Sequence, residues 1–187
     1  MSGLGDLESF EATYDLCCSL IRRNIPGDFV ECGVYAGAHC AIMAAALCDL
    51  NAEWNRRVHL FDSFEGIPLA GPEDHELKDA PAGIAACSVD QVKLNFQHWG
   101  LPPHVFVYNR GYFETTITPS LEFPDRIALL RLDGDLYRST KPCLDVLLPR
   151  VSRGGWVVVD DFNLSGCRQA VMEKIVPAPI YFRLPTK

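Results

Sequence analysis

Apolar and polar residues follow two patterns along this chain, and each pattern predicts a different element. Apolar residues at helical spacing predict an amphipathic helix over residues 8–24. Further helices are expected over residues 38–50, 89–99, 141–151 and 167–176. Short apolar runs predict strands over residues 28–32, 57–61, 104–108, 127–132 and 156–159, with an edge strand at 180–182. Strands that alternate with helices form parallel βαβ units, so the fold class is α/β: one doubly wound, mostly parallel sheet with helices on both faces.

The segment 63–86 interrupts this alternation. It is rich in Gly, Pro, Asp and Glu, which predicts a long loop. Loops of this length in a compact domain usually serve a function. We find no internal repeat and no linker, so residues 1–187 are expected to form a single domain with an N-terminal helix within residues 1–25.

Composition narrows the function classes. The 187 residues are 48% hydrophobic and 22% charged, as in a globular domain with a real core. The net charge of −7 argues against a nucleic-acid partner, because phosphate binding requires a basic face. No apolar run reaches the roughly 18 residues of a membrane span, and the N-terminus does not resemble a signal peptide. A cytoplasmic protein that acts on a small molecule is expected.

The eight cysteines could indicate a disulfide framework. They lie mostly inside apolar segments, however, and none of them forms a CxxC pair. We therefore interpret them as buried thiols of a protein in a reducing compartment.

Acidic residues follow two of the predicted strands. Asp133-Gly134-Asp135 comes directly after the run 127–132, and Asp160-Asp161 comes directly after the run 156–159. If these runs are neighbouring parallel strands, the four carboxylates converge at the strand ends where open α/β sheets bind ligands. So many close anions would repel one another, and a hard divalent cation such as Mg²⁺ explains them best.

Asp133-x-Asp135 has other interpretations. An EF-hand loop is excluded, because its twelfth position, residue 144, is leucine instead of glutamate. A DxD glycosyltransferase site stays open, although the chain shows no second domain for an acceptor. Acids that cap a helix beginning near Ser139 would explain Asp135 but not the pair Asp160-Asp161.

A glycine turn and a following acid predict a nucleotide-like ligand. Glu31-x-Gly33-x-x-x-Gly37 lies between the first strand and the next helix, where backbone amides and a helix N-terminus receive such ligands. Its spacing departs from GxGxxG, so a turn used only for close packing is the alternative. Asp62 ends the second strand, where an acid can accept hydrogen bonds from ribose hydroxyls. Its alternative role is a cap, since Asp62-Ser63-Phe64-Glu65 also fits a capping box.

Together, several longer stretches carry a resemblance to a known family. They are 26–37 (PGDFVECGVYAG), 61–68 (FDSFEGIP), 88–92 (SVDQV) with 95–96 (NF), 111–116 (GYFETT), 130–140 (LRLDGDLYRST) and 154–162 (GGWVVVDDF). On these stretches the chain resembles the macrocin O-methyltransferase family. Its members are metal-dependent enzymes that transfer a methyl group from S-adenosylmethionine to sugar hydroxyls of natural products. The resemblance implies a Rossmann-like class I methyltransferase fold.

The resemblance also implies roles for individual residues. Asp133, Asp160 and Asp161 would hold Mg²⁺, and Asp135 would be the general base. The cofactor-binding residues implied by the resemblance are Glu31, Gly33 and Gly37 at the methionine end, Asp62 at the ribose, and Ser88, Gly111 and Tyr112 near the adenine. Ser63 is a further cofactor-binding candidate. The acceptor would be a hydroxyl of a sugar or a catechol-like diol.

Two departures from the family affect the substrate pocket. The chain starts later than typical members, so an N-terminal lid is expected to be shortened, and the region after Val176 is brief. A methyltransferase-like protein that binds the cofactor without activity is therefore an alternative. The N-terminal helix and exposed apolar edges are compatible with a homodimer.

Overall fold

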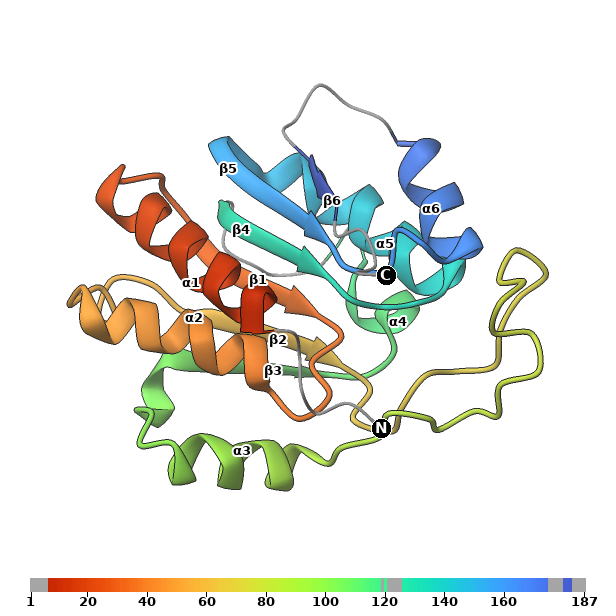
Figure 1. Ribbon diagram of the computed structural model, residues 1–187, viewed down its shortest axis with the longest axis horizontal. Helices are drawn as coiled ribbons and strands as arrows, with labels where there is room; N and C mark the ends of the chain where they lie inside the picture. The colour runs from red at the N-terminus through yellow and green to blue at the C-terminus, as the bar shows by residue number, and fades with distance from the viewer. Residues whose placement is uncertain (1–6, 119, 121–125, 175–179, 183–187) are drawn as a thin grey trace.

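The computed structural model describes residues 7–118, 120, 126–174 and 180–182. Its centre is a six-stranded sheet in the order β3-β2-β1-β4-β5-β6, and every neighbouring pair is parallel (Figure 1). The strands are β1 (Asp28–Cys32), β2 (Val58–Asp62), β3 (Phe106–Arg110), β4 (Ile127–Leu132), β5 (Val151–Val159) and β6 (Ile180–Phe182). The predicted α/β class with one parallel, doubly wound sheet is confirmed.

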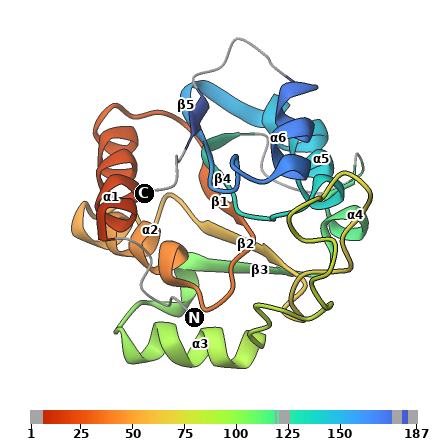
Figure 2. The ribbon, with the colours of Figure 1, turned by 45° about the vertical axis from the view of Figure 1, so that its right-hand side comes forward.

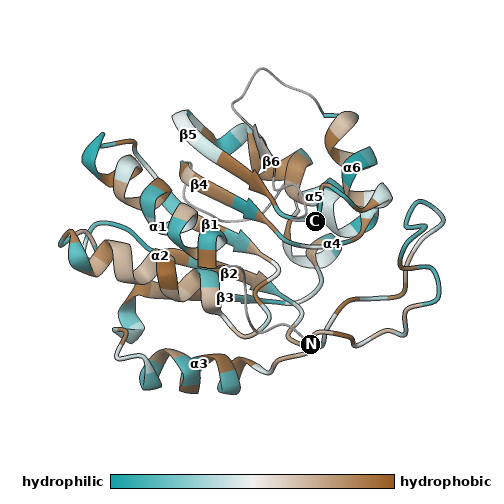
Figure 3. Ribbon diagram, viewed as in Figure 1, coloured by the Kyte–Doolittle hydropathy of each residue, from teal (hydrophilic) through white to brown (hydrophobic). Residues whose placement is uncertain are grey.

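Helices cover both faces of this sheet (Figure 2). One face carries α1 (Leu7–Arg22), α2 (Ala38–Asp49) and α3 (Val89–His98), whose apolar side chains share one core cluster with the sheet. The other face carries α4 (Phe113–Thr116), α5 (Tyr137–Val146) and α6 (Ser165–Met172), which form the second cluster. The central strand β4 is apolar along most of its length, while α3 alternates between apolar and polar residues (Figure 3). This contrast follows from burial, because a central parallel strand is covered on both faces and an outer helix on one.

Most predicted elements agree with the structure to within about two residues, the usual uncertainty of element ends. The strand predicted at 104–108 begins two residues later, because Pro103–Val105 form a 3₁₀ turn before it. The helix predicted at 167–176 runs instead from Ser165 to Met172, residues 173–174 form a turn, and residues 175–176 lie outside the described residues. The predicted loop is confirmed, since residues 63–88 connect β2 to α3 without a helix or strand.

The helix predicted at 141–151 is wrong in position. It runs from Tyr137 to Val146, with Pro142 inside it, and a 3₁₀ turn at Leu148–Arg150 follows. The start of this helix is stabilised by a residue remote in the sequence, because Tyr137 N donates to Asp74 Oδ1 at 2.8 Å. A local pattern cannot show such a contact.

The strand predicted at 156–159 begins five residues earlier, at Val151. It contains Gly154 (φ 85) and Gly155, and the pairing with β4 shifts register in this part of the strand. Glycine inside a strand often marks such an irregularity. Because of these two glycines, the sequence pattern did not predict the first half of β5.

All eight cysteines are free thiols, and six of them are buried. The expectation of buried thiols instead of a disulfide framework is confirmed. Among the helices of the described residues, none is long and apolar enough to cross a membrane.

The topology determines where ligands can bind. Strand β1 pairs with β2 on one side and with β4 on the other, so the strand order reverses between β1 and β4. In open α/β sheets the crevice at this reversal, at the carboxyl ends of the strands, receives the ligand. The glycine turn after β1 and the acids after β4 and β5 all lie at this edge.

Candidate active site

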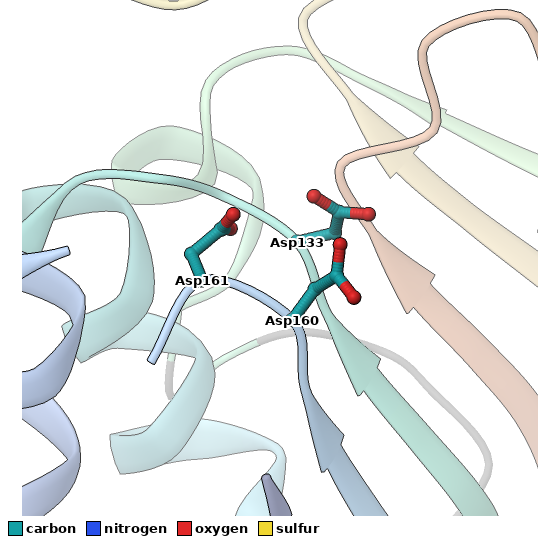
Figure 4. A group of neighbouring side chains, drawn as sticks. All are labelled: Asp133, Asp160 and Asp161. Atoms are coloured by element: carbon teal, nitrogen blue, oxygen red, sulfur yellow. The ribbon is translucent and has the colours of Figure 1, made fainter. Parts of the chain in front are cut away.

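Three carboxylates meet at the carboxyl ends of β4 and β5. Asp133 follows β4, while Asp160 and Asp161 follow β5 (Figure 4). One oxygen from each of the three lies within 4.8 Å of the others. The predicted convergence is confirmed for these three of the four acids, because β4 and β5 are neighbouring parallel strands.

Arg131 is the counter-charge of this cluster. Its side chain is 2% exposed, and its Nε donates to Glu31 Oε1 at 3.0 Å. Its Nη2 donates to Asp133 Oδ2 at 2.8 Å and lies 3.3 Å from Asp160 Oδ1. The sequence analysis assigned Arg131 no role, although a lone arginine in the apolar run 127–132 was the available signal. A buried arginine must have acidic partners, because an unpaired charge is costly away from water.

Burial dominates the electrostatics of the cluster. It raises the pKa of Asp133 to about 6, although Arg131 opposes this shift. Burial, followed by the charge of Asp133, raises the pKa of Asp161 well above its usual value. Burial disfavours the charge of Arg131, but the neighbouring acids more than offset this effect and raise the pKa of Arg131. The site therefore holds excess negative charge in a poorly solvated place.

The donor set fits a hard divalent cation. Asp133, Asp160 and Asp161 offer carboxylate oxygens, the ligands that Mg²⁺ and Ca²⁺ prefer. Burial raises the pKa of Asp133 and of Asp161 even with Arg131 beside the cluster, so further positive charge would favour their ionised forms. A cation between them would supply that charge.

Asp135 is joined to the cluster through its backbone. Its amide donates to Asp161 Oδ2 at 2.9 Å, and its φ of 59° places it in the left-handed region that Asp tolerates better than most residues. Burial, then the charges of Asp160 and Asp74, raises the pKa of Asp135. A carboxylate whose pKa is raised is a better proton acceptor once it is ionised.

The two glycines of the turn after β1 serve different purposes. Gly33 has φ 93, and a Cβ there would overlap the carbonyl oxygen of Asp133. Gly37 has φ 89 and faces Phe96, whose Cε1 would lie 2.7 Å from a Cβ. Gly33 therefore lets the end of β1 approach the acid cluster, whereas Gly37 serves helix packing, the alternative stated for this turn.

The side chains of Glu31 and Asp62 are both engaged by the protein. Glu31 is 2% exposed and accepts from Arg131 and from Cys40 Sγ at 2.7 Å, and burial raises its pKa to about 7. Asp62 Oδ2 accepts from the amides of Val34 at 2.6 Å and Tyr35 at 3.1 Å.

Asp62 caps a turn, but the predicted capping box does not form, because no helix begins within residues 63–88. Its Oδ1 accepts from the amide of Phe64 at 2.7 Å, so the carboxylate organises its own turn and the glycine turn at once. Any ribose contact would add to these bonds.

A cavity of about 510 Å³ joins these parts, a size typical of small-molecule sites. The candidate residues that line it are Glu31, Gly33, Asp62, Ser63, Tyr112, Asp133, Asp135 and Asp160. The candidates outside its lining are Gly37, Ser88, Gly111 and Asp161.

Two of these outlying candidates have structural roles. Ser88 caps α3, where its Oγ accepts from Gln91 N at 3.2 Å. Gly111 N donates to Asp62 O at 2.8 Å, which ties the end of β3 to the end of β2.

Four further lining residues, none of them a candidate from the sequence, lie in α1, α2 and α3 or directly after α3: Phe10, His39, Asn95 and Trp99. The side chains of His39 and Thr13 are 3.1 Å apart, and the rings of His39 and Phe10 are 4.9 Å apart. Helix α1 thus closes one side of the cavity.

Known proteins are similar to this chain in sequence and in fold. The 8-demethyl-8-(2,3-dimethoxy-alpha-L-rhamnosyl)-tetracenomycin-C 4'-O-methyltransferase of Streptomyces olivaceus is 35% identical over 176 residues, which cover 91% of this chain and 65% of that protein. The demethyldecarbamoylnovobiocin O-methyltransferase of Streptomyces niveus is 35% identical over 179 residues, 92% of this chain and 66% of that protein. The solved structure of the O-methyltransferase NovP matches with a TM-score of 0.80 at 35% identity, over 88% of this chain and 69% of that chain.

The chain spans about two thirds of the length of the two curated relatives, 65% and 66%. The sequence model of the macrocin-O-methyltransferase (TylF) family matches residues 1–176. The matched region includes every candidate residue described above. The resemblance seen in the sequence is thereby confirmed, and the chain belongs to the macrocin-O-methyltransferase (TylF) family.

Proposed function

We propose that this protein is a Mg²⁺-dependent O-methyltransferase that moves a methyl group from S-adenosylmethionine to a hydroxyl of a small glycosylated metabolite. One observation carries the proposal: three carboxylates converge at the strand ends beside a cavity that also contains the glycine turn. Family membership supports the methyl donor, and the relatives' names support a sugar-bearing acceptor.

The donor would bind at the glycine turn. Gly33, Asp62, Ser63 and Tyr112 line the cavity on the side of β1, β2 and β3. This is the side on which nucleotides bind to doubly wound sheets. When bound, S-adenosylmethionine supplies a methyl group on a sulfonium centre, so the protein has to align an acceptor oxygen with it.

Asp133, Asp160 and Asp161 would hold Mg²⁺ at the end of β4 and β5. A bound Mg²⁺ lowers the pKa of an acceptor hydroxyl and orients it. Arg131 keeps two of the three ligands, Asp133 and Asp160, in place without the metal.

Asp135 is the proposed general base. It lines the same cavity, and its raised pKa suits a group that must accept a proton from a weakly acidic hydroxyl. The hydrogen bond from its amide to Asp161 would keep it at a constant position relative to the metal.

The acceptor would enter beside the long loop, because Gly66, Ile67, Pro68 and Ala85 of residues 63–88 line the cavity. A sugar with vicinal hydroxyls fits this chemistry, and so does a diol.

The proposal is tested by incubating the protein with S-adenosylmethionine and a panel of glycosides, with Mg²⁺ or with EDTA. We expect a product heavier by one methylene unit with Mg²⁺, no product with EDTA, and recovery after Mg²⁺ is added back. Asp135→Asn should bind cofactor and metal but lose turnover. The control is Asp79→Asn, which changes an exposed aspartate of the loop 63–88.

Full activity in EDTA would refute the metal role, and turnover by Asp135→Asn would place the base elsewhere. Cofactor binding without turnover of any glycoside would favour a protein that binds the cofactor but is not an enzyme. Affinity for a nucleotide sugar with none for S-adenosylmethionine would favour the glycosyltransferase alternative.

A further inference from the structure

The loop of residues 63–88 begins at the end of β2. It extends to the face of the sheet that carries α4, α5 and α6, where it lies beside the starts of α5 and α6 (Figure 2). The contacts come from its segment 71–76. They join parts of the chain that are 63 and 89 residues apart. The loop therefore links the side of the cavity that leads to β2 with the side that carries the acids.

Neither α5 nor α6 supplies its own N-terminal cap. The N-cap residues are Leu136 and Leu164, and neither side chain can accept a hydrogen bond. A helix start leaves several amides without an intrahelical partner, and Ser, Thr, Asp or Asn usually satisfies one of them. Both helices need an acceptor from elsewhere.

Two acids of the loop provide these acceptors. Asp74 is 3% exposed, and its Oδ1 accepts from Tyr137 N at 2.8 Å, while its Oδ2 accepts from Gly71 N at 2.8 Å. Glu76 Oε2 accepts from Ser165 N at 3.0 Å and from Ser165 Oγ at 2.6 Å. One short segment therefore caps both helices in trans, and the negative charges lie at the positive ends of the helix dipoles.

Glycine at position 166 leaves space for the Asp74 side chain between the starts of α5 and α6. A Cβ at Gly166 would overlap Asp74 Oδ1 and would lie 2.9 Å from Tyr137 N. Ser165, beside Gly166, also donates from Oγ to Glu73 O at 2.8 Å. The starts of α5 and α6 thus close around the Asp74 carboxylate.

These two helices begin immediately after the acid cluster. Asp133 and Asp135 precede Tyr137 on one segment, and Asp160 and Asp161 precede Ser165 on the other. A displacement of either helix start would move the acids attached to it. We propose that Asp74 is a positioning residue that holds the metal-binding acids and the acceptor side of the cavity in one fixed geometry.

The loop also forms part of the cavity wall. Its two limbs pair through Ile67 N to Ile84 O and Gly83 N to Ile67 O, both at 2.9 Å. Ile67, Pro68 and Ala85, from these limbs, line the cavity. The two limbs are paired with each other, and the segment 71–76 between them is bound to α5 and α6. The position of Asp74 therefore affects the part of the cavity wall that would contact an acceptor. The assignment of this surface to an acceptor rests on the proposed function.

The test compares Mg²⁺ binding by calorimetry in the wild-type chain and in Asp74→Ala, Gly166→Ala and the double variant. Loss of an outer partner of metal ligands typically costs about 10- to 100-fold in metal affinity, so we expect roughly tenfold weaker binding for each single variant. The double variant should be no worse than either single one, because both changes remove the same contact. Affinity for S-adenosylmethionine should stay unchanged, which a general loss of structure would not allow.

Two controls accompany these variants. Asp79→Ala removes an exposed aspartate of the same loop and should leave Mg²⁺ affinity unchanged. Asp74→Asn keeps one acceptor oxygen and should lie between wild type and Asp74→Ala, so it replaces Asp74→Ala if that variant does not fold. Folded Asp74 and Gly166 variants with unchanged Mg²⁺ affinity would overturn the inference.

Amide hydrogen exchange separates this inference from the proposed function. If the wild-type chain binds no Mg²⁺, the metal-dependent function fails. The positioning role is then decided by exchange in segments 133–137 and 160–166, which should be faster in Asp74→Ala than in Asp79→Ala. Equal exchange in the two variants would overturn the positioning role.

Discussion

Arg131 donates to Asp133 at 2.8 Å, and these two residues, at the end of one strand, pair a buried guanidinium with a partly exposed carboxylate at the centre of the site. Because the same guanidinium also holds Glu31 at 3.0 Å, it connects β4 to β1 across the reversal point of the sheet. Arg131 therefore joins acids of both strands to one buried guanidinium. The repulsion among the acids is offset in part by the positive charge of Arg131, which the fold buries beside them.

Replacing Arg131 should destabilise the fold. Arg131→Lys keeps the charge, but one ammonium group cannot donate to Glu31 and Asp133 through a fork. Breaking a buried pair costs about 3–5 kcal/mol, and we expect a loss of at least roughly 2 kcal/mol in the free energy of unfolding, measured by urea titration. The control is Arg138→Lys, since Arg138 is 51% exposed and pairs with Glu114 at the surface. Equal losses for the two variants would show that the buried network contributes nothing special.

Stability should depend on pH through Glu31. Its pKa is raised from 4.5 to about 7 in the folded chain, so between these values the unfolded chain has released a proton that the folded chain keeps. The free energy of unfolding therefore falls as the pH rises through this window and is constant above it. We expect Glu31→Gln to lack this decline, which is on the order of 3 kcal/mol.

The measurement for Glu31 is a series of urea titrations between pH 4.5 and 8 on both proteins. Other acids with raised pKa values titrate in both, so the difference between the two curves isolates Glu31. A difference that is independent of pH would contradict the raised pKa.

Gly33 should tolerate no side chain. Gly33→Ala places a Cβ against the carbonyl of Asp133, in addition to the strain of φ 93. Gly100→Ala is the matched control, because Gly100 has φ 71 and nothing within 4 Å of a Cβ. We expect about 1–2 kcal/mol of destabilisation at Gly100 from backbone strain alone, and at least roughly 4 kcal/mol at Gly33, measured by chemical denaturation. Similar losses would mean that the approach of β1 to Asp133 is not tight.

Thiol labelling should distinguish two classes of cysteine. Cys48 and Cys87 are partly exposed, whereas the other six are buried. Buried thiols in apolar surroundings react poorly. An aromatic disulfide reagent should modify only these two in the native chain and all eight in denaturant, as counted by mass spectrometry. Rapid labelling of all eight under native conditions would contradict this packing.

Much of the fold could be predicted locally because the central strands β1, β2 and β4 are almost entirely buried. The run 127–132 was predicted with the bounds of β4, since six apolar or buried positions end at an acid. The glycine-rich start of β5 and the position of α5 were not predicted. In both cases the element depends on a partner strand or on Asp74, which local periodicity does not include.

The candidate site divides in the same way. Asp133, Asp160 and Asp161 could be placed together because parallel neighbouring strands bring their ends to one edge. Ser88 and Gly37 matched a motif, yet they cap and pack helix α3 outside the cavity lining. Motif position alone does not distinguish a residue that binds a ligand from one that shapes the turn beside it.

The sequence by itself determined the alternation of strands and helices, the acids at the strand ends and the family. Only the tertiary structure decided which distant residues became partners: Arg131 with Glu31, 100 positions apart, and Asp74 with Tyr137, 63 positions apart. The physical reason is that periodicity and capping rules act over a few neighbouring residues. The pairing of buried charges and of free helix amides is settled by whichever acceptor the folded chain brings within hydrogen-bond distance.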